Sequence, residues 1–219
     1  KHILSMGVSL VAAAGAPWFI LPIDLVGYAK LTTTNVSTAG AKTITMTPIA
    51  ATAAKVDRYP NGEGLRMFVA SYAAMGANAP TMQVTYTNSA GTTGRTTTAG
   101  IVSTASATSG VLLNSGNAAN KVGPFLNLAA GDTGVKDIES LTWGGTAHAS
   151  GSVFVGLCKP LCMPIPVPAT GLFNLVDFVN TLPSMPRLRN GANVQFLIFA
   201  TGATTSGATL YTTFDYGWN

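Results

Sequence analysis

Short runs of β-branched and aromatic residues, separated by Gly, Asn and Pro, constrain the fold of this chain more than any other feature. They recur roughly every 8–12 residues, a spacing typical of β-sandwiches and barrels. The runs that we predict as strands are Trp18–Tyr28, Lys42–Thr47, Leu65–Tyr72, Met82–Thr87, Thr93–Thr98, Phe125–Leu128, Val135–Trp143, Ser152–Leu157, Asn193–Ala200 and Ala208–Tyr216. The sequence therefore predicts an all-β fold, an antiparallel β-sandwich of jelly-roll-like type.

Two of these runs show how each strand is expected to be buried. Met82–Thr87 alternates apolar and polar residues and is followed by Asn88-Ser89-Ala90-Gly91, so it predicts a hairpin with one buried face. Asn193–Phe199 ends in a continuous apolar run, which favours a central strand covered on both faces. At most one short helix is expected, over Gly171–Leu182, where leucines and valines recur at helical spacing before Pro183.

The length of 219 residues suits a single domain. We expect residues 18–219 to form one β-sandwich domain and residues 1–17 to form an extended N-terminal arm or a first strand. Within the domain, residues 99–120 are small and lack periodicity, so they predict a long loop excursion. Residues 160–168 contain four prolines, which predicts an extended strap between subunits or sheets. No membrane span is expected, since the apolar run from Leu10 to Ile23 is shorter than the roughly 20 residues required.

Charge is scarce throughout the chain. Charged residues make up 9% of the sequence, against about 25% in an ordinary soluble domain. The exterior must therefore consist mainly of Thr, Ser, Asn, Gly and small apolar groups, which suits surfaces that other subunits cover. The net charge is +4, but the twelve Lys and Arg residues are scattered. Because nucleic-acid-binding proteins cluster such residues, no specific nucleic-acid partner is expected.

The chain has eight acidic residues, and most of them are too dispersed to form an acid–base pair. The closest group is Asp132, Asp137 and Glu139. Asp137 and Glu139 share a face of a predicted strand, and Asp132 lies in the preceding turn. They could hold a calcium ion or act as a glycosidase pair. The interpretation that we favour is a turn aspartate beside two solvated strand residues, so we predict no cofactor and no essential metal.

The remaining reactive side chains do not form a recognisable catalytic motif. Cys158 and Cys162 lie roughly 13 Å apart if the segment is extended, beyond the roughly 7 Å that a disulfide spans. We therefore predict free thiols, which favours assembly in a reducing cytoplasm. His148 lies in a glycine-rich segment, and neither a G-x-S-x-G elbow nor a phosphate-binding glycine loop is present. The chain is predicted not to be an enzyme.

Aromatic residues near both ends exceed what a charge-poor exterior would leave in water. The residues are Trp18, Phe19, Tyr211, Phe214, Tyr216 and Trp218. We predict that these six contribute to an interface in a homo-oligomer, expected to be a trimer. For the aromatics of Asp57–Gly62 and Phe214–Asn219, the protein's own core and a surface that stacks on sugars remain alternatives to an interface.

Four stretches resemble structural proteins of tailed-bacteriophage virions. They are Val84–Thr96, Pro124–Lys136, Leu157–Leu161 and Ala208–Trp218. The resemblance implies a non-enzymatic protein that functions in an assembly. The major capsid protein itself is disfavoured, because its fold requires a long helix and no extended helical periodicity is present.

The resemblance is closest to a capsid decoration, or cement, protein, which stabilises a phage head through subunit interfaces. Its implied partners are further copies of itself and the major capsid protein, and its implied location is the virion, assembled in the host cytoplasm. Two alternatives remain open. One is another phage component from the tail tube, neck or fibre base, and the other is a secreted glycan-binding β-sandwich.

Overall fold

The computed structural model describes residues 1–11, 18–45, 47–48, 58–98, 101–103, 106–107, 109–113, 123–167, 171–181, 185–200 and 209–217. Strands account for 55% of the structure and helices for 7%. The strand pairs whose register is defined are all antiparallel. The predicted all-β sandwich class is confirmed.

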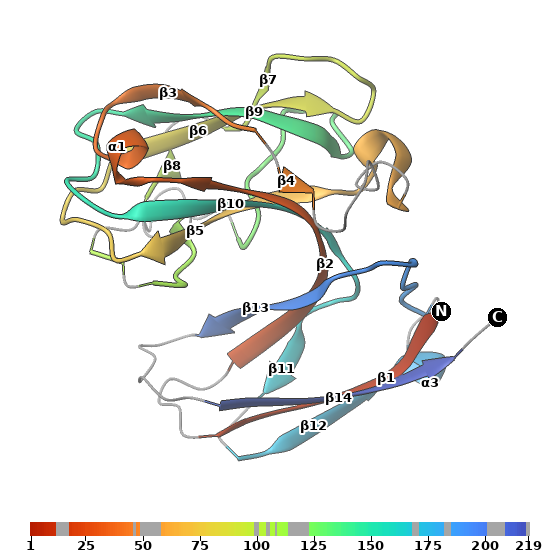
Figure 1. Cartoon of the computed structure of the whole chain (residues 1–219). Helices are drawn as coiled ribbons and strands as arrows, with labels where there is room; N and C mark the ends of the chain where they lie inside the picture. Colours follow the sequence, from red (N-terminus) through yellow and green to blue (C-terminus); the bar gives the residue numbers. More distant parts are fainter. Residues whose placement is uncertain are drawn as a thin grey trace. The chain divides into compact units, whose positions relative to one another are not determined.

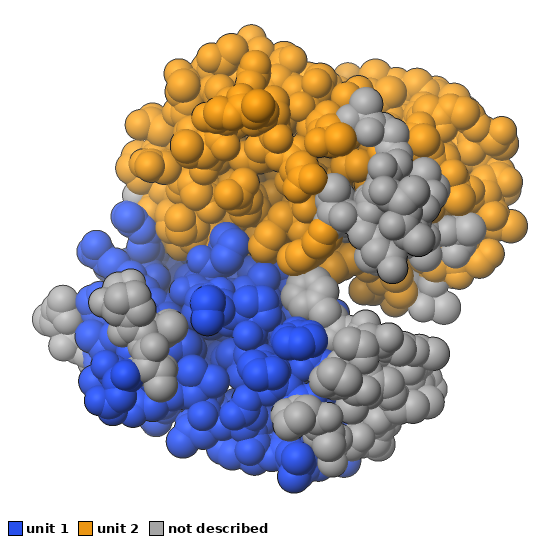
Figure 2. All heavy atoms as spheres, turned by 180° about the vertical axis from the view of Figure 1, so that it is seen from behind, with its two compact units in different colours: residues 1–24, 160–219 blue, residues 25–159 orange. Residues whose placement is uncertain are grey.

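The chain divides into two compact units, coloured separately in Figure 2. Unit 1 consists of Lys1–Asp24 and Pro160–Asn219, and unit 2 consists of Leu25–Lys159. Strand β2 (Trp18–Leu31) contributes its first half to unit 1 and its second half to unit 2. The division therefore falls within the segment 18–219 that the sequence led us to expect as one domain.

Unit 1 is a two-layered sandwich (Figure 1). One layer has the order β12-β1-β14, and the other pairs β11 and β13 with the first half of β2. The bounds are β1 His2–Val11, β11 Ile165–Val167, β12 Phe173–Asp177, β13 Val194–Ala200 and β14 Thr209–Gly217. The core between the layers contains Ile3, Met6, Val8, Leu10, Trp18, Ile20, Ile165, Val167, Phe178 and Leu188.

The N-terminal segment is an integral strand of unit 1. Strand β1 pairs with β12 on one side and β14 on the other. Its side chains alternate, so that Met6, Val8 and Leu10 are buried between the layers. Of the two alternatives for residues 1–17, a first strand rather than an arm describes residues 2–11, while residues 12–17 lie outside the described part of the chain.

The prediction of a helix over residues 171–182 is wrong for most of this segment. Residues Phe173–Asp177 form β12, and among the described residues of this range Phe178–Thr181 form a helix, α3. The apolar positions fit both periodicities in so short a segment, and pairing with β1 decides in favour of the strand. Asp177 marks the change, since its Oδ1 accepts hydrogen bonds from the amides of Val179 and Asn180.

Two further expectations in unit 1 are corrected. Part of the proline strap at 160–168 is strand β11, which pairs with β2 despite Pro166, while Pro168 lies outside the described residues. A short strand tolerates one proline where no ladder hydrogen bond needs its amide. The apolar run in β13 is not central, because among the described strands it pairs with β2 alone and Ile198 is exposed.

Unit 2 is also a two-layered sandwich (Figure 1). One layer has the order β3-β9-β6-β7, with β8 also paired to β6, and the other has the order β2-β10-β5, with β4 also paired to β2. The bounds are β3 Gly40–Thr43, β4 Thr47–Pro48, β5 Arg66–Ala73, β6 Thr81–Asn88, β7 Arg95–Thr96, β8 Ile101–Val102, β9 Val135–Gly144 and β10 Ser152–Pro160. Two short helical segments, α1 (Thr33–Val36) and η1 (Pro60–Gly62), lie in the connections.

The core of unit 2 is larger than that of unit 1 and includes Trp143, Tyr86 and Met82. The predicted hairpin is confirmed, since β6 pairs with β7 after a turn in which the Asn88 side chain accepts a hydrogen bond from the Thr92 amide. The strand expected at Phe125–Leu128 is irregular backbone instead. Within the expected excursion 99–120, the described residues include β8.

Candidate functional site

The predicted turn residue Asp132 is the centre of a hydrogen-bonded cluster in unit 2. Its Oδ2 accepts hydrogen bonds from the Tyr86 hydroxyl at 2.6 Å and from Arg95 Nε at 3.0 Å. Its Oδ1 accepts one from Asn88 Nδ2 at 2.8 Å. The Tyr86 hydroxyl in turn accepts a hydrogen bond from the Ala129 amide. The carboxylate thus fastens the turn after residue 128 to strands β6 and β7.

These hydrogen bonds determine the protonation of the cluster. The pKa of Asp132 is lowered to about 2. The main cause is the hydrogen bond donated by the Tyr86 hydroxyl, and the second is the hydrogen bond from Arg95. The pKa of Tyr86 is raised to about 12, mainly by burial and secondly by the hydrogen bond to Asp132. At neutral pH the carboxylate is therefore charged and the phenol protonated, which does not suit either group for proton transfer.

The other two candidate metal ligands are bonded elsewhere. Glu139 Oε1 accepts hydrogen bonds from Thr87 Oγ1 at 2.8 Å and from the Gly94 amide at 3.1 Å. Asp137 Oδ1 accepts one from the Ile138 amide. Within the described part of the chain, no group of three His, Cys, Asp or Glu side chains is placed to hold a metal ion. The structure therefore does not bring Asp132, Asp137 and Glu139 together as a calcium site.

His148 is buried rather than held in an open loop. Its Nε2 lies 2.6 Å from the Ser103 hydroxyl, and its ring packs edge-on against Trp143. Burial lowers the pKa of His148, so the imidazole is neutral at pH 7. A catalytic serine and its base must reach a substrate. Because both side chains are buried, the pair fixes the segment 144–151 on the core of unit 2.

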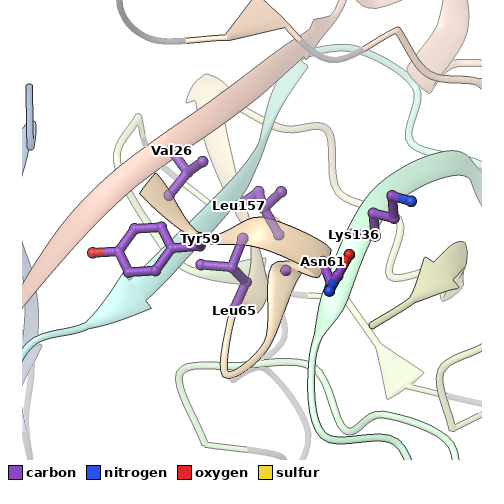
Figure 3. A pocket seen from close by; sticks show the side chains of 7 residues that line it. Val26, Tyr59, Asn61, Leu65, Lys136 and Leu157 are labelled. Atoms are coloured by element: carbon purple, nitrogen blue, oxygen red, sulfur yellow. The ribbon is translucent and has the colours of Figure 1, made fainter. Parts of the chain in front are cut away.

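A small hollow opens beside η1 in unit 2 (Figure 3). Its lining consists of Val26, Tyr59, Asn61, Gly62, Leu65, Lys136 and Leu157. The free space is about 10 Å³, enough for one water molecule. The hollow is too small for an organic substrate, and the Tyr59 side chain in its lining is buried.

Both cysteines are free thiols. Cys158 is buried in β10 and Cys162 is half-buried. Burial raises the pKa of Cys162 to about 12, so the reactive thiolate is scarce at neutral pH. Neither residue is placed as a nucleophile.

The predicted interface aromatics have different surroundings in unit 1. Trp18 is only 3% exposed and belongs to the core, so its assignment to an interface is wrong. Alternation along β2 turns Trp18 and Ile20 inward, whereas Phe19 is exposed. Tyr211 and Tyr216 are exposed, and Phe214 is half-buried between Phe196 and Tyr216, with ring centroids 5.8 and 5.9 Å away. Trp218 lies outside the described residues.

Exposed large apolar side chains are concentrated in unit 1. Among the described residues, all of them except Tyr72 belong to this unit. They are Val11, Phe19, Met163, Leu172, Phe173, Leu175, Val179, Met185, Ile198, Tyr211 and Tyr216. A gathering of this kind marks an interaction surface more often than a solvated exterior.

Strands β12, β1 and β14 present a continuous part of this surface, which we call the outer face. The strand register aligns Phe173 with Ser9 and Tyr211, Leu175 with Gly7 and Thr213, Asp177 with Ser5 and Asp215, and Val11 with Thr209. Side chains in these positions point away from the core, because their neighbours Met6, Val8 and Leu10 point into it. Phe173, Leu175, Tyr211 and Val11 are 56%, 58%, 58% and 41% exposed.

Gly7 lies at the centre of the outer face beneath an aromatic ring. A Cβ atom at Gly7 would lie 2.1 Å from Cζ of Phe173 and 2.5 Å from Oγ1 of Thr213. The ring of Phe173 therefore rests directly on the backbone of β1, a position that any side chain at residue 7 would obstruct. The absence of a side chain at residue 7 leaves room for the ring of Phe173 at the centre of the face.

Charge on the outer face is confined to one end. Asp177 and Asp215 flank Ser5, whose hydroxyl donates a hydrogen bond to Asp215. Neither Lys nor Arg occurs among the residues that define the face. The face is thus apolar over most of its length and acidic at one edge, an arrangement suited to contact with another protein.

Of the exposed residues on the outer face, the sequence had pointed to Tyr211 as an interface residue but not to Phe173 and Leu175. The misassigned helix at 171–182 concealed them, because a helical interpretation turns their apolar stripe toward the core. Their alternation with the less apolar Asn174 was the available signal.

Comparison with protein-family models, with curated proteins and with solved structures found no match. No helix in the described part of the chain is long and apolar enough to cross a membrane. The functional proposal therefore depends on the residues of this chain.

Proposed function

We propose that this chain is a non-enzymatic structural protein of a virion, of the capsid decoration or cement type, which stabilises a phage head through contacts with neighbouring subunits. The observation that supports this proposal is the outer face of unit 1, where Phe173, Leu175 and Tyr211 are exposed on a regular sheet. A face of this kind loses its exposed apolar area when a partner covers it.

The scarcity of charge supports the same function. Subunits of a shell form extensive contacts, and permanent interfaces bury roughly 2,000 Å² or more. Each charge left unpaired in such a contact is costly. A chain with 9% charged residues can be covered on several sides without stranding charges. The most prominent carboxylate of unit 2, Asp132, is already paired with Arg95 at 3.0 Å.

The arrangement of aromatic rings in unit 2 supports a structural protein over a glycan-binding one. A ring that stacks on a sugar needs a free face. Tyr28 and Phe154 instead stack on each other, with centroids 5.3 Å apart and planes 10° apart. The Lys30 amine lies over the ring of Tyr72, 3.6 Å from its centroid. These contacts occupy ring faces that a sugar would use.

Purification of intact particles provides the direct test. We expect the chain to co-sediment with heads in a density gradient, at a fixed molar ratio to the major capsid protein, and to appear as density on the capsid surface in electron micrographs. Location on tails, necks or fibre bases would support the alternative virion components instead. Recovery of the chain only in the soluble fraction, without particles, would contradict a virion role.

A further inference from the structure

We propose that the outer face of unit 1 packs against the same face of a second copy of this chain. This inference rests on the proposed function and deepens it, because it names the partner of the assembly surface. A contact between two identical faces closes at two copies. It therefore gives a dimer at this surface, whereas the sequence led us to expect a trimer.

The size of the outer face suits a specific contact. Three strands spaced about 4.8 Å apart and four side-chain rows about 6.8 Å apart give, with side-chain margins, roughly 600 Å² per copy. The total of roughly 1,200 Å² lies at the lower limit for specific protein–protein interfaces. Phe173, Leu175, Tyr211 and Val11 make the greater part of this area apolar.

The charge distribution selects how the two copies are oriented. If their strands ran parallel, Asp177 and Asp215 of both copies would meet at one edge. If the strands run antiparallel, the acidic rows lie at opposite ends, about 20 Å apart. This separation exceeds the Debye length of about 8 Å at physiological salt. The antiparallel arrangement therefore places apolar rows against each other and leaves the carboxylates at a solvated rim.

The position of Phe173 over Gly7 supports a second sheet as the occupant. In the antiparallel arrangement, the two-fold axis passes between the row of Leu175 and Gly7 and the row of Phe173 and Ser9. The Cζ atom of Phe173 on β12 reaches over Gly7 on β1, so the ring leans along the sheet instead of standing upright from it. Sheets pack face to face at about 10 Å. Central aromatic and aliphatic residues with a polar rim are typical of the most tightly bound parts of interfaces.

The same charges disfavour two other occupants. Nucleic acids and anionic lipid surfaces are both attracted by clustered Lys and Arg. The outer face carries two aspartates and neither of these basic residues. A neutral or self-complementary protein surface is the chemistry that remains.

Sedimentation equilibrium of the purified full chain over a concentration series tests the inference. We expect a reversible monomer–dimer equilibrium for the wild type. The double variant Phe173→Ser, Leu175→Ser should raise the dissociation constant at least about tenfold, because it removes the apolar centre of the contact. Tyr72→Ser is the matched control, since Tyr72 is exposed to a similar degree but lies in unit 2, and it should leave the constant unchanged. Far-ultraviolet circular dichroism verifies that each variant is folded.

A charge variant tests the antiparallel orientation. Asp215→Asn should change the dissociation constant less than about threefold, and added salt should have a similarly small effect, because the carboxylates lie apart. Marked tightening of the dimer by Asp215→Asn would instead mean that carboxylates of the two copies meet, and would overturn the orientation.

Two results would overturn self-association at this face. One is a wild type that stays monomeric at millimolar concentration, and the other is a double variant whose dimer is unaffected. If the wild type is monomeric but the double variant no longer enters particles, the face binds a different virion protein, and the proposed function stands without this inference. If the dimer forms and responds to the variant but no particle contains the chain, the inference stands and the virion role fails.

Discussion

Both units place an aromatic ring over a glycine of a neighbouring strand, but the exposure of the ring differs. In unit 2, the ring of Phe68 on β5 covers Gly156 on β10, and a Cβ at Gly156 would lie 2.3 Å from its Cζ. In unit 1, Phe173 on β12 covers Gly7 on β1. Phe68 is buried, whereas Phe173 remains more than half exposed.

The difference shows which unit buries its own apolar surface. Unit 2 has the larger core, and within it the Asp132 carboxylate and His148 Nε2 are hydrogen-bonded to Tyr86 and Ser103. Unit 1 exposes large apolar side chains on a regular sheet face. Unit 2 thus buries most of its large apolar side chains within the chain, and the proposed dimer contact would bury those on the outer face of unit 1.

The largest expected effect on folding is in the core of unit 2. Trp143→Ala removes one of the largest fully buried side chains and its contact with His148. We expect the free energy of unfolding to fall by about 3–5 kcal/mol, the usual cost of deleting a buried aromatic side chain. Urea denaturation followed by circular dichroism measures it.

The comparison requires the opposite result in unit 1. Phe173→Ser should change the free energy of unfolding of the monomer by no more than about 0.5 kcal/mol, as for most surface substitutions. Equal losses in the two variants would mean that Phe173 is part of the core and would remove the distinction between the units.

Substitution of the two glycines tests the comparison at a matched pair of sites. Gly156→Ala must displace the ring of Phe68, which is buried, so we expect a loss of about 1–3 kcal/mol from overpacking. Gly7→Ala displaces the ring of Phe173, which can move into solvent, so the loss should be smaller. Thermal denaturation of both variants gives the ranking. A larger loss in Gly7→Ala would show that the outer face is already packed within the monomer.

The strand pattern was predictable because it depends on local alternation and turn residues. Met82–Thr87 and the turn residues Asn88–Gly91 specify a hairpin without reference to the rest of the chain. Residues 171–182 were not predictable in the same way, since a short segment that is apolar at many positions fits either period. Pairing of β12 with β1 more than 160 residues away decides its structure, and no local signal contains that pairing.

The candidate surface was partly predictable. In a chain with so few charged residues, some aromatic side chains are expected to be exposed, and Phe19, Tyr211 and Tyr216 are. The burial of Trp18 depends on which face of β2 points inward, which the sequence does not specify. Ser103 and His148 are 45 positions apart in the sequence and come together through the fold, so their spacing in the sequence did not reveal the hydrogen bond between them. The division into two units depends on which strands pair, a property of the whole chain.

A moderate effect is expected from protonation of His148 in unit 2. Its pKa in the folded state is lowered from 6.5 by burial, so the unfolded chain binds the proton more readily. Stability is therefore complete above about pH 6.5 and falls as the pH decreases below it. We expect urea midpoints to decrease between pH 7 and pH 5 in the wild type and to change less in His148→Gln. Parallel curves for the two proteins would assign the decrease to other groups.

A further pH effect is expected at the Asp132 cluster, where Asp132→Asn preserves the shape of the side chain but removes its charge. Hydrogen bonds lower the pKa of Asp132 in the folded state from 3.8 to about 2. The unfolded state thus binds the proton first, so the contribution of Asp132 is complete above about pH 4 and is lost as the pH falls toward 2.

Urea midpoints at pH 7, 4, 3 and 2 should therefore decrease more steeply in the wild type than in Asp132→Asn. Asp177 in unit 1 provides the comparison. Its pKa is also lowered, chiefly by the hydrogen bond from the Asn180 side chain, but that contact lies at an exposed helix start within one strand–helix connection. Asp132 instead joins a turn to two strands. We therefore expect Asp177→Asn to reduce the fall of the urea midpoint between pH 4 and pH 2 less than Asp132→Asn does. The reverse order would place the acid-sensitive contact in unit 1.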